Sequence, residues 1–432
     1  MSTQTKLQEP VLDGGISAIN FFNGRLLTAQ DMIREKSANR EVGRRLGRAI
    51  GDGVAYGLEV GPSPESKPGA PALQIEAGLA VNRLGQTLAL RDRTTLTLVR
   101  QAEAGASELG SFVECQPIQT GTYVAGQGVY LLALAPAEKR EGRALTSGLG
   151  NEAASCSTDT IIETVQFRLI QIDPFLDQGE LLNETLLRSR LAYRCLGVSQ
   201  LTSFTSNPYG LPLDRYGLLD ELRDSVFTDC DVPLAVLYWT SSGGIRFVDM
   251  WAVRRRLTHR AHESSWQWLT SDRRLSEAEA GLLQFEDQIR DIRATEQNVD
   301  SIVAENRFEF LPPLGWLPIK APTGLMTVRN SSNSAGFSAP LFFGNRRSLQ
   351  LSLLDAAQWR SLFHEALFHE PVDLRKNRRL QLYLIWENLQ DVERAAVAQL
   401  ILVFASPELP YRGAARFGYD KWSMSRIARS VI

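Results

Sequence analysis

The chain has 432 residues, of which 44% are hydrophobic, so it is several times longer than a small domain needs to bury a stable core. Its 47 Lys and Arg nearly balance its 49 Asp and Glu, and the net charge is −2. Such a balance provides no overall field for holding a phosphate backbone, so it excludes nucleic-acid binding by bulk charge and predicts no nucleic-acid partner. Two or three domains are expected.

The N-terminus and the cysteines bear on the cellular compartment. The first ten residues are polar and lack the apolar core of a secretory signal, and no apolar stretch reaches the roughly 20 residues of a membrane-spanning helix. The four cysteines are widely spaced and form no Cys-x-x-Cys pair, which predicts reduced structural thiols. We therefore expect a cytoplasmic protein without a signal peptide or a transmembrane helix.

Residues 1–15 are predicted to form an arm, which ends at an Asp-Gly-Gly turn signal. Thr28, with Asp31 three residues later, then forms a capping-box-like start for a helix that runs towards Gly43 or Gly47. This helix has a sparse apolar side, which consists of Met32, Ile33, Val42 and Leu46.

A mainly β domain is expected over residues 16–253. The expected strands cover residues 54–60, 73–77, 87–90, 95–99, 129–134, 164–170, 234–239 and 245–253. The loop at 61–71 holds four prolines and two glycines, which exclude regular structure there. The Ser-Ser-Gly-Gly run at 241–244 predicts a hairpin between the last two strands.

Residues 254–305 change character and are predicted to form a helical neck. Ser276 and Glu279 resemble a capping box at the start of a long helix. Along that helix, apolar residues recur at alternating spacings of 3 and 4, with Glu296 as the single interruption. The predicted oligomerisation seam consists of Ala278, Leu282, Phe285, Ile289, Ile292, Val299 and Val303.

This spacing is typical of a coiled-coil heptad. At roughly three heptads, an amphipathic helix packed on its own domain remains the alternative. If the seam joins copies of the chain, replacing Leu282 and Ile289 with Asp would dissociate the oligomer.

Residues 306–432 are predicted to form a small α+β docking domain that ends in an aromatic and basic tail. Its strand-like segments lie at 349–353, 380–386 and 397–404, and a helix is expected around 356–368. The tail residues that we expect to dock on a partner, or alternatively on the chain's own fold, are Arg412, Arg416, Phe417, Tyr419 and Trp422.

Catalytic and metal motifs give no positive signal. His364 and His369 are five residues apart, so on a helix they point about 140° apart, unlike the i, i+4 pair of a zincin. The chain has no P-loop motif, and no nucleophile elbow is evident. The sequence therefore predicts a protein that is not an enzyme and that binds no cofactor or metal.

Three segments carry a resemblance to a known group of proteins. Residues 19–32 (INFFNGRLLTAQDM), 54–60 (VAYGLEV) and 75–90 (IEAGLAVNRLGQTLAL) resemble a pattern found in phage-tail-like contractile injection systems. The order of a β region, a helical stretch and a compact C-terminal domain also resembles the shoulder, neck and head plan of the trimeric baseplate protein of type VI secretion. That protein is in turn similar to phage receptor-binding proteins.

The resemblance implies a structural baseplate adaptor: a homo-oligomer, with a trimer favoured, that binds other baseplate or tail proteins. It would be assembled into a particle, and its C-terminal domain would face a membrane, a membrane protein or a target. Phe21 and Phe22, which lie within the first resembling segment, are candidate docking residues.

Two alternatives remain open. One is a cap adaptor at the distal end of the sheath and tube. The other is a soluble receptor- or carbohydrate-binding tail protein, in which Trp239, Trp251, Trp266 and Trp268 would supply stacking surfaces unless they belong to the core.

Overall fold

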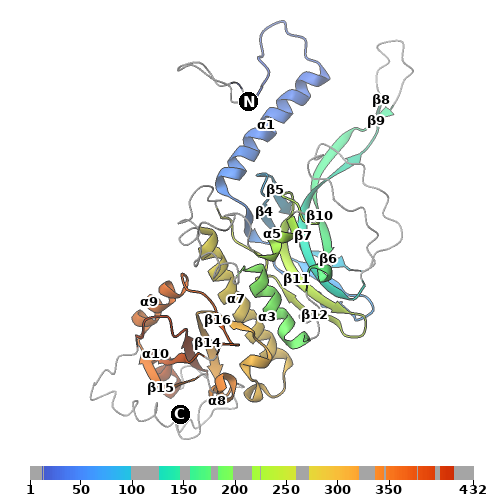
Figure 1. The fold of residues 1–432 in the computed structure, drawn as a ribbon. Coiled ribbons are helices and arrows are strands. Elements are labelled where there is room, and N and C mark those ends of the chain that lie inside the picture. Colours follow the sequence, from blue (N-terminus) through green and yellow to red (C-terminus); the bar gives the residue numbers. More distant parts are fainter. Residues whose placement is uncertain are drawn as a thin grey trace, which may run out of the picture.

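The computed structural model shows an α+β protein with several sheets, as the sequence predicts (Figure 1). The residues that it describes are 12, 14–98, 126–145, 156–176, 183–197, 217–223, 225–258, 272–320, 336–344, 347–376, 378–394 and 399–412.

The chain begins with the long helix α1 (Ala29–Ile50), which extends away from the body of the molecule (Figure 1). Six short strands follow and form two antiparallel sheets, ordered β1-β4-β5 and β2-β3-β6. Their bounds are Gly53–Gly57 for β1, Val60–Pro62 for β2, Ala72–Ile75 for β3, Gly78–Val81 for β4, Thr87–Leu90 for β5 and Thr94–Thr97 for β6.

The largest N-terminal sheet is four-stranded and antiparallel, with the order β10-β7-β11-β12. Its strands are β7 (Gly128–Glu141), β10 (Thr160–Gln171), β11 (Val232–Thr240) and β12 (Gly244–Asp249). The outer ends of β7 and β10 continue as a projecting hairpin, beyond which lie the short strands β8 (Ala144–Leu145) and β9 (Cys156–Ser157) (Figure 1).

Strand β7 is the centre of the N-terminal core because both of its faces are covered. Leu132 and Leu134 pack with the two small sheets, whereas Leu131 and Ala133 pack with α3 (Glu184–Cys195) and α5 (Leu218–Arg223). The sequence of a strand that is buried on both faces is a continuous run of apolar residues, without alternating polar ones. The β7 segment VYLLALA has this pattern.

The C-terminal sheet has the order β14-β18-β17-β15. Its strands are β14 (Leu314–Ile319), β15 (Arg347–Leu354), β17 (Leu380–Ile385) and β18 (Leu400–Ala405). Strands β15 and β17 are parallel and flank α9 (Ala356–Ala366) in the sequence, while the other pairs are antiparallel. One face of β18 packs with α7 (Asp272–Thr295) and the other packs with α9.

The shorter elements connect these layers. They are η2 (Asp173–Phe175), η3 (Val299–Ser301), η4 (Ala304–Asn306), β13 (Phe310–Leu311), α8 (Ala339–Phe343), β16 (Val372–Asp373) and α10 (Trp386–Glu393).

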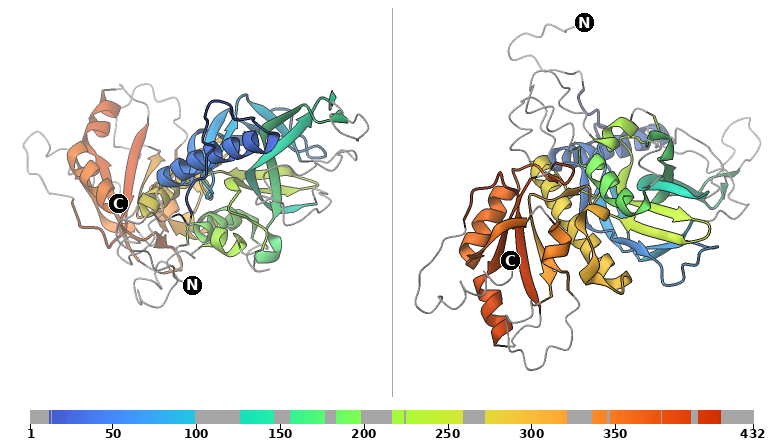
Figure 2. Two further views of the ribbon diagram at one scale, coloured as in Figure 1. Left: turned by 90° about the horizontal axis from the view of Figure 1, so that it is seen from above. Right: turned by 60° about the horizontal axis from the view of Figure 1, so that its bottom comes forward.

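Helix α7 does not form a separate neck. In both views of Figure 2 it lies between the C-terminal sheet and the N-terminal sheets. Phe285 belongs to the C-terminal core, where its ring lies 5.4 Å from that of Phe404, and Ala280 packs with Tyr193 of α3. Ser276 does not cap the helix, because α7 begins at Asp272 and the buried Ser276 hydroxyl has no hydrogen-bond partner among the described residues.

The structure gives the redox state of two of the four cysteines. Cys195 on α3 is free and buried, and burial raises the pKa of its thiol to about 12. Cys230 is disulfide-bonded, so the prediction of reduced thiols is wrong for this residue. Spacing along the sequence could not anticipate this bond, because folding determines which cysteines meet.

Candidate assembly surface

Large apolar side chains are exposed over the N-terminal segment and α1. Of the sixteen large hydrophobic residues that are exposed in the described part of the chain, ten lie between residues 12 and 50. These are Leu12, Phe21, Phe22, Leu26, Leu27, Met32, Ile33, Val42, Leu46 and Ile50. Single exposed apolar residues are ordinary on a protein surface, but their concentration here makes this region a candidate interaction surface.

The start of α1 is fixed by polar contacts. Thr28 and Asp31 form the predicted capping box, and Arg25 lies 3.0 Å from Asp31. Hydrogen bonds from the Thr28 amide and hydroxyl lower the pKa of Asp31 most, burial acts to raise it, and Arg25 lowers it further. The carboxylate is therefore ionised at neutral pH, and the helix N-terminus that it caps is electrostatically favoured.

The segment before α1 folds back along the helix. The Ile19 amide donates to Glu35 at 3.2 Å, and Arg25 donates to the Asn20 carbonyl at 2.8 Å. The Arg25 guanidinium also lies 5.8 Å from the centre of the Phe22 ring. These contacts order the backbone, yet Phe21 and Phe22 remain 56% and 62% exposed. The structure thus places both predicted docking residues at the surface.

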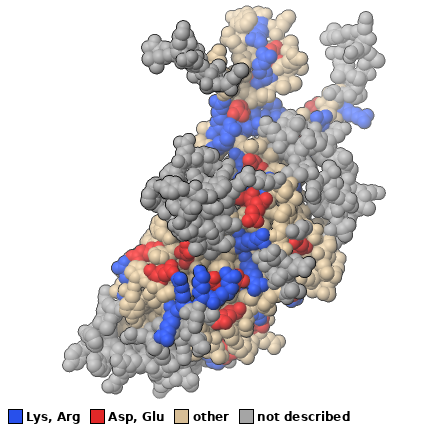
Figure 3. Space-filling model, viewed as in Figure 1, with Lys and Arg blue, Asp and Glu red and all other residues tan. Residues whose placement is uncertain are grey.

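Salt bridges hold α1 against the projecting hairpin. Arg40 pairs with Glu163 of β10 and lies 3.5 Å from the buried carboxylate of Glu138 on β7. Lys36 lies 3.6 Å from Glu163. Burial acts to raise the pKa of Glu163, but Arg40 and Lys36 outweigh it and lower the pKa overall. Figure 3 shows basic side chains gathered where α1 joins the body.

The C-terminal end of α1 packs closely against the body of the molecule, where two glycines bring their backbones together. A Cβ at Gly47 would lie 2.1 Å from the carbonyl oxygen of Gly85, in the turn between β4 and β5. A Cβ at Gly85, which has a φ of +78°, would lie 2.0 Å from the carbonyl oxygen of Arg44. Only glycine at both positions allows the two backbones to approach so closely.

We expect Gly47→Ala to lower the free energy of unfolding by about 1–3 kcal/mol, because the neighbouring atom is backbone and cannot move aside. Gly43→Ala is the matched control. Its Cβ would meet nothing within 4 Å, so this exchange in an exposed helix is expected to stabilise by up to about 1 kcal/mol. Urea denaturation measures both variants, and equal stabilities would contradict the role of the glycine contact.

The predicted seam on α7 is already occupied within the chain. Leu282, Phe285, Ile289 and Ile292 are at most 7% exposed, and the last three belong to the C-terminal core. The remaining members differ: Val299 is buried in η3, beyond the end of the helix, whereas Ala278 and Val303 are half-buried. The helix is therefore the amphipathic alternative, and the expectation of an open coiled-coil seam is corrected.

The predicted tail site is only partly described. Arg412 forms an ion pair with Glu365 of α9, and Tyr411 lies against Tyr383 with ring centres 5.8 Å apart. The described start of the tail therefore docks on the chain's own fold. The other predicted tail residues lie outside the described residues; they are Arg416, Phe417, Tyr419 and Trp422.

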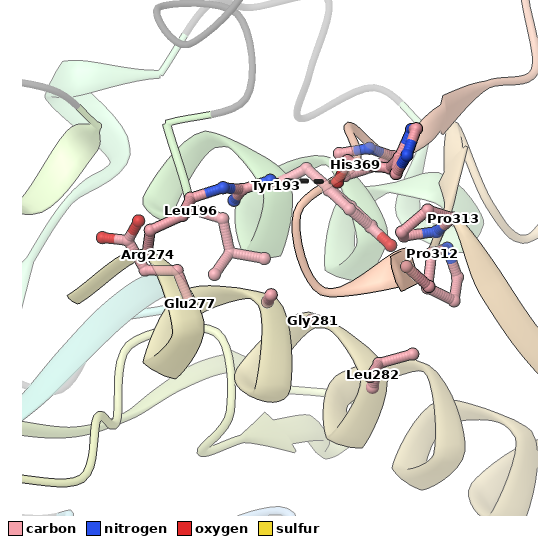
Figure 4. Close-up of a pocket in the computed structure, with 12 residues that line it drawn as sticks. Tyr193, Leu196, Arg274, Glu277, Gly281, Leu282, Pro312, Pro313 and His369 are labelled. Atoms are coloured by element: carbon pink, nitrogen blue, oxygen red, sulfur yellow. Dashed lines mark hydrogen bonds between the residues drawn. The ribbon is translucent and has the colours of Figure 1, made fainter. Parts of the chain in front are cut away.

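Two hollows in the described part of the chain are candidate ligand sites. The first, between α3, α7 and the loop that carries His369, has a volume of about 20 Å³, which suits one water molecule rather than a substrate (Figure 4). Within it, Arg274 donates to the His369 carbonyl at 3.0 Å. The second is an open surface hollow where Glu184 accepts from Tyr238 at 3.2 Å and Asp173 accepts from the Val129 amide at 2.7 Å. Both carboxylates are therefore engaged in hydrogen bonds within the chain.

Residues suggested for other chemistry are dispersed. His364 lies on α9, whereas His369 follows the end of that helix. The described residues contain no group of three or more potential metal ligands. Trp239 is 8% exposed and belongs to the N-terminal core, Trp251 is half-buried, and Trp266 and Trp268 lie outside the described residues. Within the described ranges, no helix is both long and apolar enough to cross a membrane.

The sequence indicates that α1 has an apolar side, but the spacing of those residues does not determine whether that side faces the chain's own core or solvent.

No family model matches the chain, and no curated protein matches it. Among solved structures, a chain of the type VI secretion TssK-TssF-TssG baseplate subcomplex is similar over 66% of this chain and 74% of that chain, with 10% identity and a TM-score of 0.25. A TM-score of this size is too low to indicate a common fold.

Proposed function

We propose that this chain is a non-enzymatic structural component of a phage-tail-like contractile injection system, and that it acts as a homo-oligomeric baseplate adaptor. In this proposal the N-terminal segment and α1 bind other proteins of the particle. The C-terminal domain, which lies at the other end of the molecule in Figure 1, faces a membrane or target.

One observation carries the proposal. The first of the three segments that resemble injection-system proteins, residues 19–32, is also a segment where several large apolar side chains are exposed. Leu26 is 90% exposed and Phe22 is 62% exposed, although the backbone around them is held by hydrogen bonds. A fixed backbone that presents aromatic and aliphatic side chains to solvent is suited to docking, because little ordering is required on binding.

The test uses the double variant Phe21→Ser/Phe22→Ser in cells that assemble the particles. Both side chains are exposed, so the stability of the isolated chain is expected to change by less than about 0.5 kcal/mol. We expect the variant to fold normally but to be lost from the particle fraction on sedimentation, because aromatic anchors dominate interface energies.

Phe368→Ser is the matched control. Phe368 is 55% exposed in the C-terminal domain, far from α1 in the sequence, and its variant is expected to co-sediment like the unaltered chain. Normal recovery of the double variant in particles would contradict the proposed assembly surface.

A further inference from the structure

The buried cores of the chain divide at α7. All buried members of the two N-terminal clusters precede residue 254, and all buried members of the two C-terminal clusters follow residue 284. Residues 29–258 are called the N-terminal body below, and residues 272–412, which include α7, are called the C-terminal unit. In the part of the chain that the structure describes, one small apolar cluster contains residues from both parts: Tyr193, Leu196, Ala280 and Phe310.

Ion pairs connect the two parts across this junction. They join Arg188 to Asp291 at 2.5 Å, Arg190 to Glu309 at 2.5 Å, Arg256 to Glu279 at 3.0 Å and Arg273 to Asp220 at 2.9 Å. In each pair, at least one of the two side chains is 25% or more exposed. Salt screens such solvent-accessible pairs more strongly than it screens pairs inside a core.

Helix α7 presents different chemistry to its two neighbours. Phe285, Ile289 and Ile292 belong to the C-terminal core, whereas Gln284 donates to Asp249 of the N-terminal body at 3.0 Å. An apolar side of α7 is thus buried within the C-terminal unit, and a polar side meets the N-terminal body. If the two parts separate, α7 therefore stays with the C-terminal unit, because detaching it would expose its apolar side to water.

Packing and hydrogen bonding are incomplete at the junction. The hollow of about 20 Å³ lies here, between α3 of the N-terminal body and α7 of the C-terminal unit (Figure 4). The buried Tyr193 hydroxyl and the buried side-chain oxygen of Gln284 have no hydrogen-bond partner among the described residues. Water would pair with both groups if the junction opened, so opening recovers part of the free energy that it costs.

We infer that the junction is a salt-sensitive docking contact: when its ion pairs are screened, the C-terminal unit separates from the N-terminal body as a folded part. The angle of that unit to α1 and to the projecting hairpin then changes. A small, polar interface between two separate cores is the kind that permits one domain to move relative to another. The inference goes beyond the proposed function and does not depend on it, because it concerns the chain alone.

The reactivity of an engineered thiol measures the opening of the junction. Ala280→Cys places a thiol at a position that is 2% exposed. We expect this thiol in the full-length chain to react with a maleimide several times faster at 1 M sodium chloride, where the screening length falls to about 3 Å, than at low salt. The reaction of the unaltered chain is subtracted. Leu196→Cys, on the other side of the junction, repeats the measurement if Ala280→Cys does not fold.

The control thiols lie inside the two cores. Ala133→Cys in the N-terminal body and Ala405→Cys in the C-terminal unit are at fully buried positions, and both are expected to stay protected at either salt concentration. Reactivity that does not change with salt at the junction would overturn the inference. Equal acceleration at the control positions would also overturn it, because the chain would then be unfolding as a whole.

Removing the charges tests whether the ion pairs hold the junction closed. Arg190→Gln/Arg273→Gln, made in the Ala280→Cys chain, is expected to raise the thiol reactivity at low salt and to weaken its salt dependence. Arg378→Gln is the matched control, since Arg378 pairs with Glu408 within the C-terminal unit, and it should leave the reactivity unchanged. A double variant that reacts no faster at low salt than the Ala280→Cys parent would contradict the docking role of these pairs.

Discussion

Replacing Arg188 with methionine is expected to lower the free energy of unfolding by about 3–5 kcal/mol, the cost of removing one partner of a buried ion pair. Arg188 on α3 donates to Asp249 of β12 at 2.8 Å and also pairs with Asp291 of α7. Asp249 is 2% exposed, and only Gln284, at 3.0 Å, and the Ala252 amide, at 2.9 Å, are described as its remaining donors. Without the guanidinium, a carboxylate would stay buried with its charge uncompensated.

The control is Arg290→Met on α7. Arg290 is 72% exposed at its side chain and pairs with Asp287, so its loss is expected to cost at most about 1 kcal/mol. The double variant Arg188→Met/Asp249→Leu should recover much of the stability lost by Arg188→Met, because it removes the buried charge together with its partner. Chemical denaturation measures all three variants. A loss below about 1 kcal/mol for Arg188→Met would contradict the buried network.

The short strands and turns of the N-terminal region could be predicted because their signals are local. The expected strand at 87–90 coincides with β5, and the expected hairpin around 241–244 joins β11 and β12. The capping box at Thr28 and Asp31 is present, although α1 continues past both glycines to Ile50. Turn residues, caps and β-branched runs act on their immediate neighbours, so the sequence is sufficient to locate them.

The surface against which each of these helices packs could not be predicted from the sequence. Both α1 and α7 carry apolar residues at spacings of 3 and 4, and the longer pattern, on α7, predicts oligomerisation. In the structure, α7 buries its pattern against the C-terminal sheet, whereas α1 presents its pattern to solvent. The same period arises for a seam within a chain and between chains, because both bury one side of a helix. Tertiary packing decides between them.

The packing of α7 within its own chain predicts a second large loss of stability. Ile289→Asp is expected to lower the free energy of unfolding by more than about 4 kcal/mol, because it removes a buried aliphatic side chain and buries a charge in the same place. Ile289 is 5% exposed and lies in the C-terminal core with Phe285 and Phe404. The loss should be visible in tryptophan fluorescence, since Trp316, Trp359 and Trp386 all belong to the C-terminal domain.

Ile33→Asp makes the same exchange on α1, where Ile33 is 64% exposed, and is expected to change stability by less than about 0.5 kcal/mol. The pair separates two explanations of the α7 pattern. If Ile289 packs within its own chain, its variant unfolds the C-terminal domain at every protein concentration. If it lay in a seam between copies, the variant would yield a folded monomer, and stability would depend on concentration only in the unaltered chain. A folded, monomeric Ile289→Asp chain would therefore restore the coiled-coil interpretation of α7.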